Sequence, residues 1–421
     1  MRIFKFGGAS VKDAKGVKNL LRVLQHEGTE NTLVVVSAMG KMTNAFEKVV
    51  HSYLYNSSAL KQSIASIQDF HFTILNDLFE VNDEIHQEAH RLFESLQEFL
   101  IQNRSKEYDF IYDQVVSYGE LLSTKIISSF LKNNKIQNEW LDIRNIIKTD
   151  SNYRKANVDW QETQRNCIKL KHQKLYITQG FISSDKKNNT TTLGREGSDY
   201  TAGILAYCLN AESVTIWKDV VGVLNADPRV FKDTTLLQEL SYQEAIEMAF
   251  YGASVIHPKT IKPLENKRIP LLVRSFDELS NSGTRVSKSV PLKPEIPCFI
   301  VKKNQILVSI SANDFSFMVE ENMSHIFQLL HNYKLKVNVI QNSAISFSVC
   351  LEDNFSNFEN FYQELHPAFT VKYNKNLMLY TVRHFNENSI LALEKKGAIL
   401  LKQTSRDTIQ LILDEKNNYA K

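Results

Sequence analysis

The sequence predicts an α/β domain with a mainly parallel central sheet and helices on both sheet faces, followed by smaller α+β modules. The N-terminal part alternates strand and helix patterns, a proline-punctuated connector follows it, and the C-terminal part repeats a unit of strand, helix and strands. A chain of 421 residues is too long for one hydrophobic core, so two or three domains are expected.

The first elements follow in the order strand, glycine turn, helix, strand. Arg2 to Phe6 is expected to form a short strand, and residues 12–27 a helix, because apolar side chains there repeat at three- and four-residue steps. Thr32 to Val36 is a largely β-branched run, typical of a strand buried on both faces of a parallel sheet. Ligands of such folds bind at the carboxyl ends of the strands.

Residues 45–133 are expected to form a mostly helical insertion, because their apolar side chains mark helix faces over long stretches. Strand and helix patterns then alternate again. They are expected at Leu175 to Thr178, Ser213 to Trp217, 241–251 and Pro270 to Val273.

Polar residues and prolines mark a connector over residues 281–297. It separates a larger predicted domain, residues 1–280, from a C-terminal region, residues 298–421. In that region two similar units each place a helix between strands, with the helices expected at 323–333 and 386–395.

Composition and charge exclude several classes of function. The formal net charge is +3 on a balanced background, so no global field favours nucleic acid or an anionic membrane. No stretch reaches the roughly 18 apolar residues of a spanning helix, and the N-terminus lacks a signal-peptide pattern. The four cysteines lie far apart, which argues against a disulfide framework or a zinc site and favours a reducing cytoplasm, and no metal-ligating residues are expected.

Lys5, Gly7 and Gly8 stand at the end of the first predicted strand. Glycines let backbone N–H groups approach phosphate oxygens, a helix start adds partial positive charge, and a lysine can stabilise a migrating phosphoryl group. The motif is not the Gly-x-x-x-x-Gly-Lys-Ser/Thr phosphate loop. Taken alone, it is more typical of a plain turn with a solvated lysine.

The second predicted strand ends in a short polar stretch that contains Ser37 and is followed by Thr43. Serine and threonine at such places often only cap helices. If the ends of the first two strands converge at one edge of the sheet, Ser37 and Thr43 become candidates for contact with a substrate.

Thr190 to Asp199 is the most specific segment. A threonine run gives way to two glycines around Arg195, and an apolar helix follows. Arginine can clamp a carboxylate through charge-assisted hydrogen bonds of roughly 1.5–3 kcal/mol each, and Ser198 supplies a hydroxyl at the helix start. The residues alone leave open the alternative that Asp199 only caps the helix and Arg195 is a surface charge.

Two further charged positions follow the strand at Ser213 to Trp217. Asp219, at the strand end, could hold Lys5 in place. Asp227-Pro-Arg229 is typical of a rigid turn that presents an arginine, with a nucleotide phosphate as its expected target. A hairpin turn with an internal ion pair is the alternative explanation.

No residue pattern marks a general base, and this points to the kind of acceptor. A carboxylate with a pKa near 4 is already ionised at neutral pH. Phosphoryl transfer to it needs charge neutralisation and alignment, which lysine, arginine, Mg²⁺ and backbone donors provide. The sequence therefore favours a carboxylate acceptor over an alcohol.

Together these segments resemble the aspartokinases of the amino-acid kinase family along nearly the whole chain. Lys5 to Val11 resembles the family's opening motif, and Thr190 to Ala202 a second signature, with Glu196 in place of a glycine. Further similar segments, in the same order, are Ser117 to Ser123, Gly180 to Ile182, Asp227 to Arg229 and Gly252 to Pro258. The resemblance implies an amino-acid-kinase-type fold with C-terminal ACT-like modules. It also implies transfer of the ATP γ-phosphoryl group to the side-chain carboxylate of L-aspartate, giving 4-phospho-L-aspartate, the first step toward lysine, threonine and methionine.

The resemblance also implies roles for individual residues. Lys5, oriented by Asp219, is expected to be catalytic, Glu120 to bind the α-ammonium of aspartate and Arg195 its carboxylate. The expected aspartate site comprises Ser37, Thr43, Glu120, Phe181, Arg195 and Ser198. The residues expected to contact ATP, which enters with Mg²⁺, are Lys5, Gly7, Gly8, Lys218, Asp219, Leu224, Arg229 and Ser254. Of these, Lys218, Leu224 and Ser254 depart from the residues that are usual in the family.

The C-terminal region resembles tandem regulatory ACT modules. The segment that binds an inhibitory amino acid in the family, typically lysine or threonine, aligns with residues that include Asn338, Val339, Ser343 and Ile345. Asn338 and Ala344 stand where carboxylates are common, so the usual partner of a ligand ammonium is missing. A structural role, joining subunits into a homodimer or higher homo-oligomer, is the alternative.

Two other functions remain open. One is a kinase of the same fold that acts on another carboxylate, such as glutamate or acetylglutamate. The other is a catalytically weak paralogue that serves as an amino-acid-binding regulatory subunit, which the departures at Glu196, Lys218 and Ser254 leave open.

Overall fold

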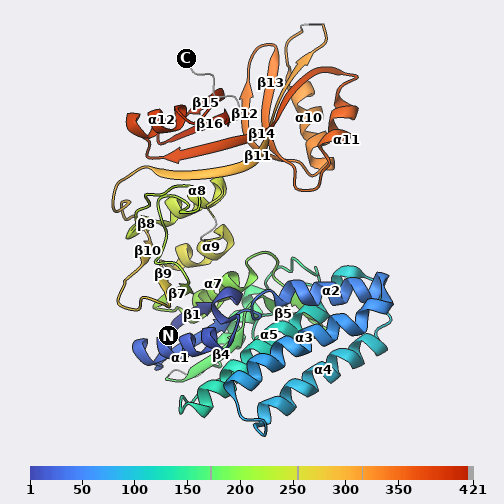
Figure 1. Cartoon of the computed structure of the whole chain (residues 1–421), viewed down its shortest axis with the longest axis vertical. Helices are drawn as coiled ribbons and strands as arrows, with labels where there is room; N and C mark the ends of the chain where they lie inside the picture. The colour runs from blue at the N-terminus through green and yellow to red at the C-terminus, as the bar shows by residue number, and fades with distance from the viewer. Residues whose placement is uncertain (171–172, 254–255, 315, 416–421) are drawn as a thin grey trace. The chain divides into compact units, whose positions relative to one another are not determined.

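The computed structural model describes residues 1–170, 173–253, 256–314 and 316–415 (Figure 1). The chain forms two compact units. The first comprises Met1–Val223, Leu236–Ile246 and Ser254–Pro294, and the second comprises Leu224–Thr235, Glu247–Ala253 and Glu295–Lys421.

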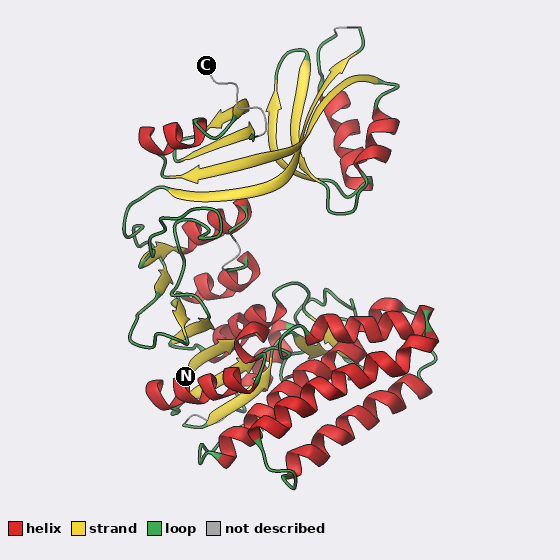
Figure 2. Cartoon of the chain, viewed as in Figure 1, coloured by secondary structure: helices red, strands yellow, loops and turns green. Residues whose placement is uncertain are grey.

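A central eight-stranded sheet organises the first unit, in the order β3-β4-β2-β1-β7-β9-β10-β8 (Figure 2). All neighbouring strands are parallel except β9 and β10. The predicted mainly parallel sheet is therefore confirmed. The strands are β1 (Arg2–Phe6), β2 (Thr32–Val36), β3 (Glu139–Leu141), β4 (Leu175–Gln179), β7 (Ser213–Lys218), β8 (Glu239–Ser241), β9 (Leu271–Ser275) and β10 (Thr284–Ser287).

Helices cover both faces of this sheet. Alternate residues of each strand point to opposite faces, so the strands pack against helices on both sides. Phe4 and Phe6 of β1 face a core that they share with α1 and the helical insertion. Ile3 and Lys5 face the other side, where α7 packs on β1, β2 and β7 and also contacts α9. The helices are α1 (Ala14–Glu27), α2 (Met42–Tyr55), α3 (Ser57–Leu78), α4 (Glu84–Gln102), α5 (Tyr108–Asn133), α6 (Trp160–Cys167), α7 (Gly197–Leu209), α8 (Tyr242–Tyr251) and α9 (Pro258–Lys267).

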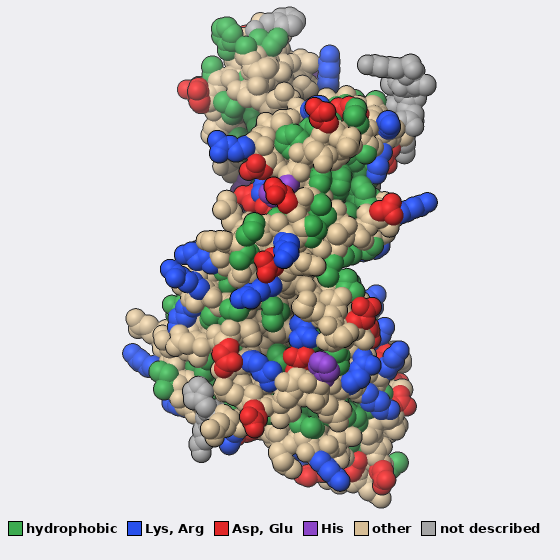
Figure 3. All heavy atoms as spheres, turned by 90° about the vertical axis from the view of Figure 1, so that its left-hand side faces the viewer, with side chains coloured by type: hydrophobic (Ala, Val, Ile, Leu, Met, Phe, Trp, Pro, Cys, Tyr) green, Lys and Arg blue, Asp and Glu red, His purple; other side chains and the backbone are tan. Residues whose placement is uncertain are grey.

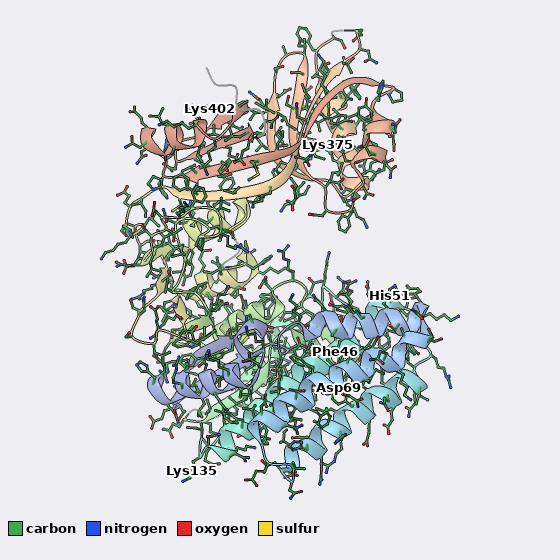
Figure 4. All side chains as sticks on the ribbon, in the orientation of Figure 1. Phe46, His51, Asp69, Lys135, Lys375 and Lys402 are labelled. Atoms are coloured by element: carbon green, nitrogen blue, oxygen red, sulfur yellow. The ribbon has the colours of Figure 1, made fainter. Side chains whose placement is uncertain are left out.

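The helical insertion consists of α2 to α5, which pack side by side (Figure 1). Phe46 of α2 is fully buried and lies among these helices (Figure 4). A Cβ atom at Gly119 of α5 would come within 3.2 Å of the Phe46 ring, so α2 and α5 meet closely at the glycine. This contact fixes α5 beside the loop that leads from β2 into α2.

A six-stranded antiparallel sheet organises the second unit, in the order β12-β13-β11-β14-β16-β15. The strands are β11 (Cys298–Ala312), β12 (Lys336–Asn342), β13 (Ser346–Glu352), β14 (Phe369–Arg383), β15 (Ala398–Thr404) and β16 (Thr408–Asp414). The helices are α10 (Glu320–Asn332), α11 (Phe358–Leu365) and α12 (Glu387–Glu394).

Two modules share the long strands β11 and β14. One half of this strand pair forms a core with α10 and α11, and the other half forms a core with α12 and β16. The first module is therefore inserted into the second. Figure 4 marks one lysine in each module: Lys375 pairs with Glu359, and Lys402 pairs with Glu394 at 3.1 Å.

The structure differs from the sequence prediction at the connector and in the repeat. Strand β10 begins at Thr284, inside the predicted connector, because Gly283 makes a tight turn beside β9. Its φ is +69°, and a Cβ atom there would lie 2.1 Å from the carbonyl oxygen of Val273. Helix α11 was not expected, since the predicted units contained one helix each.

Charge is mixed on the surface. On the face drawn in Figure 3, cationic and anionic side chains are interspersed, in keeping with a net charge of +3. Among the described residues, none of the helices combines the length and apolar character needed to cross a membrane.

Candidate active site

The carboxyl ends of β1 and β2 meet in a close backbone contact at Gly8. A Cβ atom at Gly8 would lie 2.7 Å from the carbonyl oxygens of both Ala38 and Gly40, so only glycine fits. The N–H of Gly40 donates to the carbonyl of Gly8 at 2.9 Å. The two loops thus converge at β1, which has β2 on one side and β7 on the other, the kind of switch point where α/β folds bind ligands.

The ammonium of Lys5 forms a buried ion pair with Asp199, with 2.5 Å between Nζ and Oδ1. The two side chains are 8% and 2% exposed. The sequence assigned this role to Asp219, which is exposed just beyond β7, whereas the ion pair recorded for Lys5 is with Asp199. Lys5 points to the sheet face that α7 covers, and Asp199 lies in the first turn of α7.

A second lysine stands beside this pair. Lys5 is in register with Ile216 of β7, so Lys218, two residues further along, faces the same side of the sheet. Burial lowers the pKa of Lys218, the carboxylate of Asp199 acts to raise it, and the ammonium of Lys5 lowers it further. Two ammonium groups therefore lie close together at the ends of β1 and β7, an arrangement that can neutralise phosphate oxygens.

Glu120 presents a carboxyl group that has no cationic partner among the residues that the structure describes. Its side chain, on α5, is 1% exposed, and Oε2 has no hydrogen-bond partner among the described residues. Burial raises the pKa of Glu120 to about 8, and the nearby backbone N–H of Ala38 and hydroxyl of Thr43 act in the opposite direction. A ligand ammonium would supply the missing partner.

Glycine also brings the start of α7 against the loop after β4. A Cβ atom at Gly180 would lie 2.5 Å from the Cβ of Ser198, which is itself 8% exposed. The next residue, Phe181, has φ +71° and donates its N–H to Thr201 Oγ1 at 3.0 Å. Ser198 and Phe181 are thereby held at the same edge of the sheet, and Arg195, just before α7, is exposed.

Ser37 lies on the loop after β2, and its side chain is half-buried. Its carbonyl accepts a hydrogen bond from Ser123 Oγ at 2.8 Å, and its N–H donates to the carbonyl of Phe6 at 3.1 Å. These bonds tie the loop both to β1 and to α5, which carries Glu120. Because Gly8 contacts Ala38 and the Ala38 N–H acts on the pKa of Glu120, the lysine loop and the carboxyl group share one neighbour.

Asp113 was missed by the sequence analysis, although it anchors the threonine segment. Its carboxyl group accepts from the N–H of Thr192 at 2.8 Å, from Thr192 Oγ1 at 2.7 Å and from the N–H of Arg154 at 3.0 Å. Burial raises the pKa of Asp113 to about 6, against these hydrogen bonds. The anchored strand is β6 (Thr190–Thr192), which pairs with β5 (Ile182–Ser184) and leads directly into Arg195 and α7. An acid close to Ile111, Val115 and Val116 in the sequence of a predicted helix was the available signal.

The remaining expected nucleotide contacts are distributed as follows. Gly7 lies beside Lys5, since a Cβ atom there would be 3.2 Å from Lys5 Nζ. Leu224 and Arg229 belong to the second unit, where the Arg229 side chain is 82% exposed and pairs with Asp227 at 2.7 Å. Ser254 lies outside the described residues.

The expected regulatory segment lies on β12 and the turn after it. Asn338 is already engaged within the unit: its Oδ1 accepts from Lys302 Nζ at 2.7 Å, and its Nδ2 donates to Gln305 Oε1 at 2.7 Å. Ser343 Oγ bonds Ser346 Oγ across the turn. Val339 is buried, whereas Ile345 is 46% exposed. The four residues therefore do not form one uniform polar surface.

No group of three or more His, Cys, Asp or Glu side chains within the described part of the chain is arranged to hold a metal ion. Mg²⁺ commonly takes only one or two protein carboxylates and completes its coordination with water and phosphate oxygens. Asp219, exposed next to Lys218, is a carboxylate of that kind.

Comparison with known proteins identifies the family. The model of the amino acid kinase family matches residues 1–275. Lysine-sensitive aspartokinase 3 of Escherichia coli is 30% identical over 83% of this chain and 78% of that protein, and an aspartokinase of Chlamydia muridarum is 30% identical over 84% and 78%. A bifunctional aspartokinase/homoserine dehydrogenase 2 of Arabidopsis thaliana is 30% identical over 83% of this chain. The chain spans 39% of that longer relative.

Solved structures give the same result. The chain aligns with E. coli aspartokinase III in complex with lysine and aspartate with a TM-score of 0.85 and 27% identity, over 99% of this chain and 96% of that chain. For the complex of that enzyme with aspartate and ADP, the TM-score is 0.77 at 26% identity, with the same coverage. The central sheet with its helices and the C-terminal antiparallel sheet, which is consistent with ACT-like modules, thus occur together in a known enzyme. This chain belongs to the amino acid kinase family, and the two E. coli and Chlamydia relatives named above are aspartokinases.

Proposed function

We propose that the chain is an aspartate kinase that transfers the γ-phosphoryl group of ATP to the side-chain carboxylate of L-aspartate. The observation that carries this proposal is that groups of opposite charge, two lysines and a buried glutamate, lie on either side of one loop. Lys5 and Lys218 offer cationic charge for phosphate on one side. On the other, Glu120 offers a buried carboxyl group whose Oε2 has no hydrogen-bond partner in the described part of the chain. Such a site fits two substrates, an anionic nucleotide and an ammonium-bearing acceptor.

The acceptor side is built for an amino acid. In this proposal the α-ammonium of aspartate binds Glu120, and the loss of solvation that Glu120 suffers in the free protein is offset by a direct ion pair. Arg195 binds the α-carboxylate bidentately, and the hydroxyls of Ser37, Thr43 and Ser198 orient the substrate. Phe181, held at the same edge by Thr201, limits the space beyond them.

The nucleotide side supplies charge rather than a base. Lys5, fixed by Asp199, stabilises the oxygens of the migrating phosphoryl group, and Lys218 and the N–H groups of Gly7 and Gly8 bind the phosphates. Mg²⁺ entering with ATP would neutralise phosphate charge, and Asp219 would hold it. A side-chain oxygen of aspartate attacks the γ-phosphorus, the bond to the β–γ bridging oxygen breaks, and ADP leaves.

The second unit has a separate proposed role. Its two modules would join subunits into a homodimer or higher homo-oligomer, and the segment around Asn338 would bind an inhibitory amino acid such as lysine or threonine. The bonds that Asn338 makes to Lys302 and Gln305 support the structural role more than the sensing role, because a ligand would have to displace them. A cytoplasmic location accords with four free cysteines, all buried.

The acceptor can be tested by measuring ATP-dependent ADP release with L-aspartate, L-glutamate and N-acetyl-L-glutamate. Aspartate is expected to support turnover and the other two to support little. The matched variant Glu120→Gln should raise KM for aspartate strongly, because the neutral amide gives the ammonium no countercharge. Equal turnover with glutamate, or an unchanged KM in Glu120→Gln, would contradict the proposed site.

A further inference from the structure

The buried carboxyl group of Asp113 joins three segments of the first unit through direct hydrogen bonds. Asp113 belongs to α5 and is fully buried. Its Oδ2 accepts two backbone N–H groups, from Thr192 at 2.8 Å and from Arg154 at 3.0 Å, and its Oδ1 accepts the hydroxyl of Thr192 at 2.7 Å. One carboxyl group therefore fixes both β6 and the loop around Arg154 to α5.

These two segments also hold each other, immediately before Arg195. The N–H of Ala156 donates to the carbonyl of Thr192 at 3.0 Å. A Cβ atom at Gly194 would lie 3.1 Å from the carbonyl oxygen of Arg154, so the loop lies directly against the glycine. Gly194 has φ +78°, and the chain turns there before it reaches Arg195. The backbone that presents Arg195 is thus held by two segments that the same carboxyl group fixes.

Asp113 and Glu120 lie seven residues apart on α5, close to two full helical turns, so both project from the same face of the helix. In the proposed function, Glu120 binds the ammonium of the acceptor and Arg195 binds its α-carboxylate. One helix then places both groups that recognise an amino acid, the first directly and the second through Asp113.

We propose that Asp113 is a positioning residue that fixes the segment carrying Arg195 and thereby sets the affinity of the site for the α-carboxylate of the acceptor. This inference rests on the proposed function, since it takes Arg195 as the group that binds this carboxylate. A bidentate arginine–carboxylate pair has a strict geometry, so a displaced Arg195 binds less well. The α-carboxylate does not react. Its weaker binding therefore raises KM for aspartate and leaves kcat unchanged.

The test compares the steady-state kinetics of the full chain with those of Asp113→Ala and Asp113→Asn. Asp113→Ala should raise KM for aspartate about tenfold, the loss of one charge-assisted hydrogen bond, while kcat and KM for ATP stay within about twofold. Asp113→Asn should keep KM within about threefold of the wild type, because the amide oxygen can accept both N–H groups and the amide NH₂ can donate to the Thr192 hydroxyl. Thr192→Val removes only the hydroxyl and should raise KM about threefold, so it serves as the test if Asp113→Ala does not fold.

Asp185→Ala is the matched control. Asp185 is also buried and accepts two backbone N–H groups, from Lys187 and Asn189, and the hydroxyl of Ser151. It lies between β5 and β6, at the end of β6 that is remote from Arg195. Its loss should lower stability and leave KM for aspartate unchanged, because partial unfolding reduces the amount of active enzyme and not its affinity.

A second control separates an effect through Arg195 from any other effect. In the Arg195→Met background, Asp113→Ala should change KM for aspartate by less than about twofold, because the displaced group is already absent. Amide hydrogen exchange of residues 193–197, measured without substrates, tests the anchoring independently of the reaction. Exchange should become faster in Asp113→Ala and remain as in the wild type in Asp113→Asn and Asp185→Ala.

Four results would overturn the inference: an unchanged KM for aspartate in Asp113→Ala, an equal rise in Asp185→Ala, a rise that persists in the Arg195→Met background, or unchanged hydrogen exchange in Asp113→Ala. If Asp113→Ala does not fold, an unchanged KM in Thr192→Val has the same meaning. If exchange responds as expected while aspartate supports no turnover in the wild type, the proposed function fails and the anchoring of the Arg195 segment by Asp113 stands.

Discussion

Glu120→Gln removes a buried carboxyl group that forms no ion pair within the described parts of the chain. Burial raises its pKa from 4.5 to about 8. Between these two values the folded state holds a proton that the unfolded state has lost, so the free energy of unfolding falls as the pH rises. The destabilisation by Glu120 is absent below the pKa of the unfolded state, grows through neutral pH and becomes constant above the pKa of the folded state.

The size of the effect follows from the two pKa values. Each pH unit between them costs the wild type about 1.4 kcal/mol, and the full difference corresponds to about 5 kcal/mol. Glutamine has no proton to lose. The stability of Glu120→Gln relative to the wild type should therefore increase by about 1.4 kcal/mol between pH 6 and pH 7 and level off above pH 8. Glu120→Gln should therefore stabilise the fold of the first unit while it weakens the binding of aspartate.

Urea unfolding monitored by tryptophan fluorescence can measure this difference. All three tryptophans, Trp140, Trp160 and Trp217, lie in the first unit, so the signal reports on the unit that contains Glu120. Unfolding is followed at pH 6, 7 and 8 without substrates, with Glu84→Gln as the control for loss of one exposed carboxylate. Parallel pH dependence of wild type and Glu120→Gln would refute the assignment of a buried, protonated carboxyl group.

Three further predictions concern the same site. Binding of aspartate should tighten about ninefold from pH 6 to pH 7, because the ammonium binds the ionised form of Glu120. Calorimetry in buffers of different ionisation enthalpy should show that nearly one proton is released on binding at pH 7. An affinity for aspartate that does not change with pH would contradict this. Lys5→Met should abolish turnover and destabilise the first unit by about 3–5 kcal/mol, because it leaves the buried carboxylate of Asp199 without its ion pair. The double variant Lys5→Met with Asp199→Asn should recover stability but not turnover. Recovery of turnover would exclude the role of Lys5. Gly8→Ala should lower kcat/KM for both substrates, since its Cβ would lie 2.7 Å from two carbonyl oxygens. Unchanged kinetics would show that the site does not need the close contact between the loops after β1 and β2.

Much of the larger unit was predictable from local patterns. The strand at Thr32–Val36 is buried throughout, as its β-branched composition indicates, and the long insertion is helical. These features depend on periodicity and composition within one segment. The convergence of the loops after β1 and β2 was stated as a condition, and the contact of Gly8 with Ala38 meets it.

The partner of Lys5 could not be found in the same way. Asp219 follows a strand end and is a natural candidate from sequence, whereas Asp199 was expected only as a possible helix cap. The choice depends on which sheet face α7 covers, and that is set by the crossover from β4 through α7 to β7 of the central sheet. The sequence did not identify Asp113 for a related reason, because its three hydrogen-bond donors come from segments far away along the chain.

The C-terminal region shows a third kind of limit. Its helices α10 and α12 were expected from the repeated unit in the sequence, but the insertion of one module into the other depends on the register of β11 with β14. That register changes near Gln305, a buried side chain that bonds Asn338. Sequence similarity marked Asn338 as a ligand position, and the structure adds the contacts that already occupy it.

Trapping of the reaction product with hydroxylamine tests phosphoryl transfer to aspartate most directly. An acyl phosphate reacts with hydroxylamine to give a hydroxamate, whose identity and position mass spectrometry can establish. With ATP, Mg²⁺ and L-aspartate the wild type should give the side-chain hydroxamate of aspartate, with none from glutamate and none from Lys5→Met. No hydroxamate from the wild type with aspartate, or an equal amount with glutamate, would contradict the assignment of this chain as an aspartate kinase.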